Sequence, residues 1–346
     1  MKDLSIVVPA YNCEKYIKRC LDSLLKQEKL NYEIIIVNDG STDNTLKICK
    51  EYELRYNNIK VLDKANEGQG IARNLGIKNS LGRYITFVDS DDFVNKNSYT
   101  IAVSKLKEKN ADFFIGQLKK VSKYKLEEVD LKTEKINYYN KNDKKVLVNS
   151  LLSGNNIKKN CRVSSSSCDK IYSKEILDRF NISFLSERIY LSEDIIFNII
   201  YIDRCNSYII SDLLIYNYVT NPDSFCHTYQ NNYLEKMYRM IEIFEKYKFS
   251  FSEKEFKILV AEKIYGYIKS YMFQEVEHKN LVLAGANIKI LCQQPEIRNI
   301  LFLVREKNYT VIDYIIISLS KLKIGLGIAI LYKIKIAYIN LRKNRE

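Results

Sequence analysis

The sequence has no tryptophan, two histidines and three prolines among its 346 residues. Its eight cysteines form no Cys-x-x-Cys pair, which argues against a zinc site and against a disulfide framework. We expect reduced and mostly buried thiols. Neither Gly-x-Gly-x-x-Gly nor Gly-x-x-x-x-Gly-Lys-Ser/Thr occurs in the sequence. Phosphate sites of the dinucleotide-binding and P-loop types are therefore disfavoured.

Long hydrophobic runs are also missing. The apolar run in residues 1–8 is too short for a signal peptide, so we expect the protein in the cytosol. Residues 311–319 and 324–332 are strongly apolar, but neither run reaches the roughly 20 residues that a membrane-spanning helix needs. Lysines flank both runs, which fits a helix lying on the inner face of an anionic membrane. The alternative is a helix packed on the preceding domain or in a dimer contact.

Basic residues exceed acidic ones by 13, and the excess is uneven. Residues 1–116 carry 18 basic and 16 acidic side chains, whereas residues 305–346 carry 9 and 3. A basic end on a nearly neutral N-terminal part favours attraction to a membrane surface over a nucleic-acid groove. The sequence has no recognition helix and no aromatic RNA-binding signature, so we expect no nucleic-acid partner.

The stretch from Arg83 to Asp92 combines a strand signal with three carboxylates. Its first half is apolar, β-branched or aromatic, which indicates a short buried strand. The carboxylates follow at the C-terminal end, where ligands bind in open α/β sheets. In an extended segment Asp89 and Asp91 point to the same side, so the pair could hold Mg²⁺ or Mn²⁺ and, through it, a diphosphate. The alternative is that Asp91 or Asp92 caps a following helix.

Two more strand signals run into polar loops. Residues 4–8 form an apolar run closed by Pro9, and residues 33–37 repeat the pattern before Asp39 and Gly40. Apolar residues at helical spacing follow each loop. Asp39 lies at a strand tip, where its carboxylate could accept hydrogen bonds from a nucleobase N–H or a ribose hydroxyl. The alternative is an ordinary turn aspartate.

A third short strand, residues 59–62, leads into a loop with two glycines and then a helix. The free N–H groups at the start of that helix could bind a phosphate. Arg73 lies early in the helix, where its side chain could also reach a phosphate. The alternative for Arg73 is a solvated surface side chain.

Four motifs together resemble the family 2 glycosyltransferases, which are inverting enzymes of the type A nucleotide-diphospho-sugar transferase fold. They are Pro9-Ala10-Tyr11-Asn12, Asn38-Asp39-Gly40-Ser41-Thr42-Asp43, Ala72-Arg73-Asn74 with Gly76, and Phe87-Val88-Asp89-Ser90-Asp91-Asp92. The resemblance implies a Rossmann-like α/β fold, with a mostly parallel sheet flanked by helices. It also implies a nucleoside-diphosphate sugar donor that contacts Pro9, Tyr11, Asn12, Asp39, Arg73, Asp89, Ser90 and Asp91.

The resemblance assigns roles within this set: Asp39 contacts the base, Asp89 the ribose and Asp91 the metal. Asn38 departs from the family, which often has a second aspartate there. Downstream, residues 168–177, 182–184 and 191–198 resemble the same family. There the resemblance implies that Asp194 is the catalytic base and that Glu193 and Lys170 lie on the acceptor side.

The alternative for Glu193 and Asp194 is a negatively charged first helical turn that complements the helix dipole. Relatives often carry tryptophan where this chain has Cys168. Since the chain has no tryptophan, an aromatic platform for a sugar ring must come from tyrosine or phenylalanine, or be absent. Some relatives use a late histidine as a metal or diphosphate ligand, which makes His227 a further metal candidate; an exposed loop histidine is the alternative.

The expected organisation has three parts. Residues 1–118 form the nucleotide-sugar-binding half and residues 119–230 the acceptor-side half, with the lysine-rich stretch 119–145 as a surface excursion between them. Residues 231–346 form a helical C-terminal extension. The expected function is metal-dependent, inverting transfer of a sugar from a nucleoside-diphosphate donor, for which we expect UDP. The expected acceptor is a glycan or lipid-linked glycan in surface polysaccharide synthesis. The alternatives are a sugar nucleotidyltransferase and an inactive sugar-nucleotide-binding module.

Overall fold

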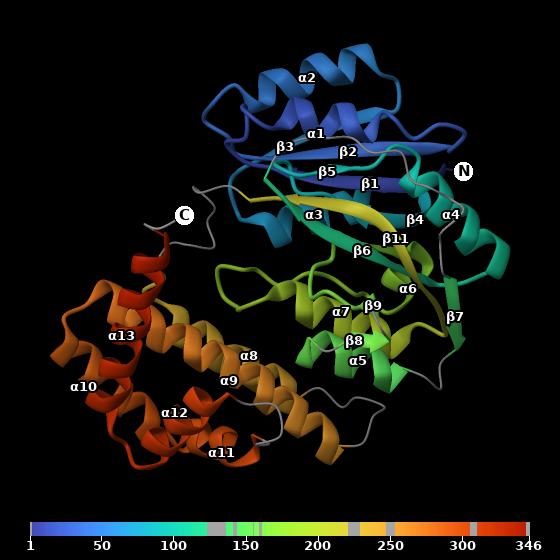
Figure 1. Ribbon diagram of the computed structural model, residues 1–346. Coiled ribbons are helices and arrows are strands. Elements are labelled where there is room, and N and C mark those ends of the chain that lie inside the picture. The colour runs from blue at the N-terminus through green and yellow to red at the C-terminus, as the bar shows by residue number, and fades with distance from the viewer. Residues whose placement is uncertain are drawn as a thin grey trace. The chain divides into compact units, whose positions relative to one another are not determined.

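The computed structural model describes residues 2–122, 136–140, 144–154, 156–158, 161–220, 229–246, 253–304 and 310–343. The chain forms two compact units, Met1–Ser224 and Phe225–Glu346. The first unit is an α/β domain and the second is helical (Figure 1). His227 lies outside the described residues.

The N-terminal half of the sheet is parallel. Its strands are β1 (Lys2–Ala10), β2 (Tyr32–Asp39), β3 (Ile59–Lys64) and β4 (Gly82–Phe87), in the spatial order β3-β2-β1-β4. β1 pairs in parallel with both β2 and β4, and β2 with β3. The predicted strand ends therefore meet at one edge of the sheet, where the polar loops after β1, β2 and β4 lie together.

The other half of the sheet is mixed. β10 (Lys170–Ser173) runs antiparallel between β4 and β6 (Phe113–Val121). β11 (Ser207–Val219) runs parallel to β6, and β5 (Phe93–Val94) and β7 (Ile136–Asn140) pair antiparallel with β11.

β11 is continuous, with register shifts around Leu214, because a bulge lets its pairing with β6 continue. One sequence expectation changes in this half of the sheet. The stretch 119–145 is not all surface excursion, because β6 continues to Val121 and β7 joins the sheet. Pairing with neighbouring strands outweighs the polar composition at the end of β6 and in β7.

Helices cover the sheet on both sides, with α1 (Ile17–Leu24) and α2 (Thr45–Arg55) on one face and α3 (Gln69–Asn79) on the other (Figure 1). α3 lies close against β1 because Gly76 has no side chain; a Cβ there would come within 2.2 Å of a Val7 methyl. This approach brings the start of α3, with Arg73, over the ends of the parallel strands.

The remaining helices of the first unit are α4 (Ser98–Lys109), α5 (Lys144–Ser153), α6 (Lys174–Arg179) and α7 (Glu193–Arg204), and β8 (Asn156–Lys158) pairs with β9 (Cys161–Arg162). α7 packs on the sheet through an aromatic cluster. Phe197 on α7 stacks on Phe184 with ring centroids 3.8 Å apart, and both rings meet Phe87 at the end of β4 edge to face. This packing fixes the first turn of α7 near the strand ends.

The second unit contains α8 (Tyr233–Lys246), α9 (Glu253–His278), α10 (Leu281–Gln293), α11 (Pro295–Leu303), α12 (Val311–Lys321) and α13 (Gly325–Lys343). The predicted helical C-terminal extension is confirmed. α10 and α13 approach closely at two glycines, since a Cβ on Gly285 would lie 2.9 Å from Cα of Leu326 and one on Gly325 2.1 Å from the Gly285 carbonyl oxygen. Of the helices described, none is both long and apolar enough to cross a membrane.

Candidate active site

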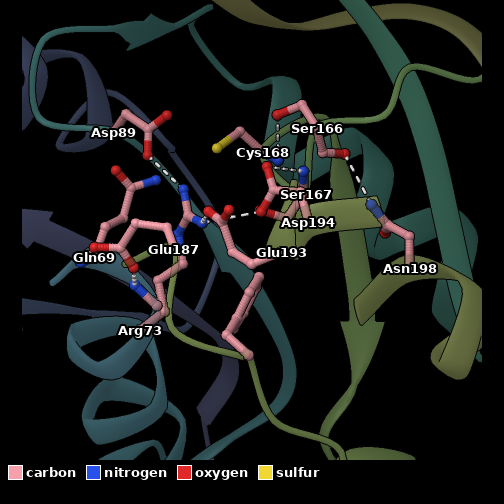
Figure 2. Close-up of polar contacts among 12 residues, drawn as sticks. Gln69, Arg73, Asp89, Ser166, Ser167, Cys168, Glu187, Glu193, Asp194 and Asn198 are labelled. Atoms are coloured by element: carbon pink, nitrogen blue, oxygen red, sulfur yellow. Dashed lines mark hydrogen bonds and ion pairs between the residues drawn. The ribbon is translucent and has the colours of Figure 1, made fainter. Parts of the chain in front are cut away.

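Arg73 is the centre of a charged cluster between the two halves of the first unit. Its side chain is fully buried, and Figure 2 shows its guanidinium between carboxylates from separate elements. Nη2 lies 2.8 Å from Asp89 after β4, and Nη1 lies 2.9 Å from Asp194 and 3.4 Å from Glu193 in the first turn of α7. The arginine thus joins Asp89, a predicted donor contact, to Asp194, the predicted catalytic base.

A buried guanidinium needs such partners, because an uncompensated charge in this position would be costly. The Phe184 ring lies beneath Arg73, 5.1 Å from the guanidinium carbon. Both terminal nitrogens already contact carboxylates, so Arg73 is not the solvated surface residue that the sequence left open. Its role as a phosphate ligand stays a prediction.

Asp194 is held from a second side by the loop before β10. The Ser167 hydroxyl donates to Oδ1 of Asp194 at 3.0 Å, and the Ser167 backbone N–H donates to Oδ2 at 3.3 Å. The Asp194 side chain keeps 22% of its surface exposed, so it is not sealed from solvent. A general base needs a carboxylate that is held in place and not sealed off.

Glu193 and Asp194 share one cation and repel each other. Burial, followed by the neighbouring Asp194, raises the pKa of Glu193. Burial also raises the pKa of Asp194, and Arg73 opposes that rise. Removing Arg73 would therefore favour protonation of both carboxylates.

Asp39 anchors the loop that follows β3. Its carboxylate accepts hydrogen bonds from the Lys64 ammonium at 2.8 Å and from the backbone N–H groups of Glu67 and Gly68 at 3.0 and 2.8 Å. Burial works to raise the pKa of Asp39, but these hydrogen bonds outweigh it and the pKa is lowered. The aspartate is thus more than an ordinary turn residue: it shapes the loop beside the strand ends.

Glu187 occupies the start of α3. Its carboxylate accepts from the N–H groups of Gln69 and Gly70 at 2.9 and 3.0 Å. The expectation that these amides are free for a phosphate is wrong, since a carboxylate of the protein already satisfies them. The same segment is tied to α3 by Asn74, whose side-chain amide exchanges two hydrogen bonds with the Phe184 backbone, both at 2.8 Å.

The loops after β1 and β2 are cross-linked. Asn12 adopts the left-handed conformation (φ 45°), and its side-chain oxygen accepts from the Thr42 N–H at 2.8 Å. The Asn12 N–H donates to the Ser41 hydroxyl at 3.1 Å. Pro9 is buried opposite Val37, and Tyr11 is 51% exposed. The structure therefore brings the predicted Pro9 and Asn12 motifs to the same edge as Asp39.

Asp91 and Asp92 behave differently. Asp92 is fully buried and accepts hydrogen bonds from the Tyr216 hydroxyl at 2.6 Å and the Val219 N–H at 2.7 Å. Burial, followed by Asp89, raises the pKa of Asp92 to about 8. Asp91 and Ser90 are half-buried, and the Asp91 carbonyl accepts from Arg19. Neither aspartate caps a helix, since β5 comes next and α4 begins at Ser98.

Asp89 and Asp91 fit a metal ion that binds together with a phosphate-bearing ligand. No group of three or more His, Cys, Asp and Glu side chains in the described ranges could hold an ion alone. Mg²⁺ in nucleotide sites is commonly held by one or two carboxylates together with phosphate oxygens and water. Asp91, with the 30% exposed Asp89 beside it, supplies that kind of partial site.

The Lys170 ammonium is engaged by groups of the protein itself. Its buried ammonium donates to Asp169 at 2.6 Å and to the carbonyl oxygens of Ser164 and Ser166 at 2.9 and 2.6 Å. These three bonds use all three N–H groups and fix the loop that carries Ser167. The predicted acceptor contact of Lys170 stays a prediction, whereas its structural role is clear.

Sequence reasoning missed two residues at the site. Ser167 precedes Cys168 at the end of a run of four serines, which was the only signal for its contact with Asp194. Glu187 stands in no motif, and only the fold brings it to α3. Six cysteines, Cys13, Cys20, Cys49, Cys168, Cys205 and Cys292, are free and buried, as expected.

Comparisons with known proteins agree on a family. Residues 5–160 match the family model described as Glycosyl transferase family 2. The glycosyltransferase GlyG of Streptococcus pneumoniae serotype 4 is 45% identical over 114 residues, which is 33% of this chain and 38% of the relative. The poly(ribitol-phosphate) beta-N-acetylglucosaminyltransferase TarS of Staphylococcus aureus is 33% identical over 202 residues, 55% of this chain and 35% of the relative. The chain thus matches well under half the length of these relatives.

Solved structures agree on the fold. Residues 1–349 of S. aureus TarS in complex with UDP superpose with a TM-score of 0.65 at 24% identity, covering 98% of this chain and 91% of that one. A mannosyltransferase from Pyrobaculum calidifontis in complex with GDP-Man and Mn²⁺ superposes with a TM-score of 0.51 at 12% identity, covering 96% of this chain and 88% of that one. The predicted type A glycosyltransferase fold with a helical C-terminal region is confirmed.

Proposed function

Residues 5–160 match the model of glycosyl transferase family 2, and from this premise we propose that the chain is a member of that family and transfers a sugar from a nucleoside-diphosphate donor with inversion at the anomeric carbon. The observation that carries the proposal is the ion-paired bridge from Asp194 through Arg73 to Asp89. It joins an accessible carboxylate to the strand end at which a donor would bind.

Asp194 would act as the general base. Inverting transfer needs one carboxylate to take the proton of the acceptor hydroxyl while that oxygen attacks opposite the leaving diphosphate. Arg73 and Ser167 hold this carboxylate from two sides. Burial raises the pKa of Asp194, and Arg73 opposes that rise, which favours the ionised form that can accept a proton. Glu193, whose pKa is raised by burial and by Asp194, would lie beside the acceptor.

Asp91 and Asp89 would hold Mg²⁺ or Mn²⁺ together with the donor. A bound divalent ion would neutralise the charge that develops on the leaving diphosphate. Asp39 would contact the base and Asp89 the ribose, and Pro9, Tyr11, Asn12 and Ser90 would line the donor site. His227 remains a low-priority metal candidate.

The donor is proposed to be UDP-linked. Two structures of one relative support this choice, since S. aureus TarS was solved in complex with UDP and in complex with UDP-GlcNAc. The acceptor is proposed to be a surface glycan polymer or its lipid-linked intermediate. Relatives named poly(ribitol-phosphate) glycosyltransferases support a polymeric acceptor, and the chain's excess of 13 basic residues suits an anionic one.

The domain roles follow from the same proposal. Residues 1–118 would bind the donor and residues 119–230 the acceptor, with the helical extension at 231–346. Exposed apolar residues and lysines on α13, including Ile334 (62% exposed) and Lys333, support a cytoplasmic protein that lies on the inner face of the membrane.

A panel of nucleotide sugars tests the proposal. The full chain is incubated with each donor, Mn²⁺ or Mg²⁺ and an acceptor glycan mixture, and released products are identified. Release of a nucleoside diphosphate supports glycosyl transfer. Release of pyrophosphate would identify a sugar nucleotidyltransferase, and binding without turnover an inactive binding module. Retention of Asp194 and Asp91 argues against the inactive module.

A further inference from the structure

The helical unit contains a hollow of about 400 Å³ that the donor chemistry does not use. That volume is within the usual range of small-molecule sites, about 300–1,000 Å³. Its lining comes from α8, α9 and α10: Leu234, Tyr238, Tyr271, Asn287, Ile290, Leu291 and Gln294. All seven residues belong to the second unit, so the hollow is formed within that unit alone.

The lining follows from helical spacing. Leu234 and Tyr238 are one turn apart on α8 and lie on the same side of the helix. The four residues from α10 and its C-cap recur at intervals of three and four, at 287, 290, 291 and 294, which places them along one stripe. Two phenol rings and two side-chain amides therefore face a common space with aliphatic side chains between them.

A buried network orients one of the amides. Glu275 on α9 is fully buried and accepts from the Tyr229 hydroxyl at 2.9 Å, the Lys279 ammonium at 2.9 Å and Nδ2 of Asn287 at 2.6 Å. Burial works to raise the pKa of Glu275, but these bonds outweigh it and the pKa is lowered, so the carboxylate is ionised and only accepts. Asn287 must then present its N–H to Glu275, which leaves its carbonyl oxygen as an acceptor for a ligand.

The chemistry of the lining selects a class of ligand. None of the seven lining side chains is charged, although 28% of the residues in the chain are. A second hollow, over α1 and α2, has the opposite character, because five of its seven lining residues are Lys or Glu. Aromatic faces that pack on C–H groups, combined with amides that pair with hydroxyls, suit a sugar ring rather than a phosphate. Tyr238 is one of the aromatic residues that could serve as a ring platform in this tryptophan-free chain.

We propose that this hollow is a binding site for a neutral saccharide unit of the acceptor. The half-buried Tyr238 would pack against the sugar, and Asn287 and Gln294 would hydrogen-bond its hydroxyls. The role of this hollow as an acceptor subsite depends on the proposed glycosyl transfer. Binding of a saccharide in the hollow does not depend on it. A subsite of this kind would hold one unit of a polymer while another unit is glycosylated, which raises its effective concentration at the active site.

Ligand-observed saturation-transfer NMR on the full chain tests the site, with glucose, N-acetylglucosamine, galactose and ribitol as probes. We expect transfer to at least one of these probes, and we expect saturating UDP to leave it in place. Tyr238→Ala and Gln294→Ala should each weaken binding of that probe by about tenfold. Tyr338→Ala is the matched control, since it removes a 65% exposed tyrosine of the same unit from α13.

Circular dichroism shows whether each variant keeps its helices, and Gln294→Ala is the milder change if Tyr238→Ala unfolds the unit. The site is refuted if no probe receives transfer, if UDP displaces the probe, or if folded Tyr238→Ala and Gln294→Ala bind like Tyr338→Ala. Nucleotide-sugar turnover, measured in parallel, separates the two proposals. Saccharide binding without turnover would refute the proposed function but support the saccharide site. Turnover without saccharide binding would support the proposed function but refute the site.

Discussion

Replacing Arg73 by methionine perturbs the charged cluster most directly. The guanidinium contacts Asp89 at 2.8 Å, Asp194 at 2.9 Å and Glu193 at 3.4 Å. Removing one partner of a buried ion pair costs about 3–5 kcal/mol, because the charge left behind is uncompensated. Asp89 and Asp194 keep 30% and 22% of their side-chain surface, so water solvates part of that charge and we expect about 3 kcal/mol.

Thermal unfolding of the purified variant measures this loss. For a unit of this size, each kcal/mol lowers Tm by about 2–4 °C, so Arg73→Met should lower the Tm of the first unit by about 6–12 °C. Arg83→Met is the matched control. Arg83 also makes a side-chain hydrogen bond, to Asn110 at 2.8 Å, but on the surface, and its loss should cost no more than about 0.5 kcal/mol.

Kinetics separate a positioning role from a phosphate contact. Arg73 lowers the pKa that burial raises in Asp194, so its removal should shift the acid limb of the kcat profile to higher pH. UDP affinity should change little, by about threefold or less. Arg73→Lys keeps the charge but loses the fork of donors, and should recover part of the activity at neutral pH. A folded Arg73→Met with normal Tm and kcat but much weaker UDP binding would refute this reasoning.

Three further predictions concern other parts of the chain. Asp91→Asn should weaken UDP binding in the presence of Mn²⁺ by about tenfold and leave metal-free binding unchanged, as measured by calorimetry. The pKa of Asp92 is about 8 in the folded state, which is above its value in the unfolded chain. The folded state therefore binds the Asp92 proton more tightly, and the stability of the wild type falls as pH rises from about 4 to 8. Asp92→Asn should therefore gain stability relative to wild type between pH 5 and pH 9 in urea unfolding. Lys333→Glu with Lys335→Glu should reduce low-salt co-sedimentation with anionic vesicles, at about 1 kcal/mol per lysine; unchanged sedimentation would exclude a membrane role for α13.

The N-terminal strands were predictable because local signals and the fold agree there. Apolar runs of β-branched residues end at proline, glycine or aspartate, and each such run became a parallel strand. The four motifs therefore reached one edge of the sheet. β7 was not predictable in this way, because its sequence is polar and its pairing with β11 is decided by a strand far away in the sequence.

The site was predictable in its residue types but not in its contacts. Asp89, Asp194 and Arg73 were identified separately, yet nothing in the sequence indicates that one buried guanidinium joins the two aspartates. Asp39 and Glu187 illustrate the same limit, since the amides that looked free in the sequence are satisfied by carboxylates 28 to 118 residues away. Long-range hydrogen bonding depends on packing, and periodicity carries no information about it.

The turnover of Asp194→Asn tests the central claim most directly. It is measured as nucleoside-diphosphate release from the best donor with acceptor present, beside wild type and the matched control Glu193→Gln. If Asp194 is the base, kcat should fall by about 10² or more while UDP affinity stays within about threefold, and Glu193→Gln should lose less. An Asp194→Asn enzyme that retains most of its turnover would contradict the account and assign the base to another carboxylate.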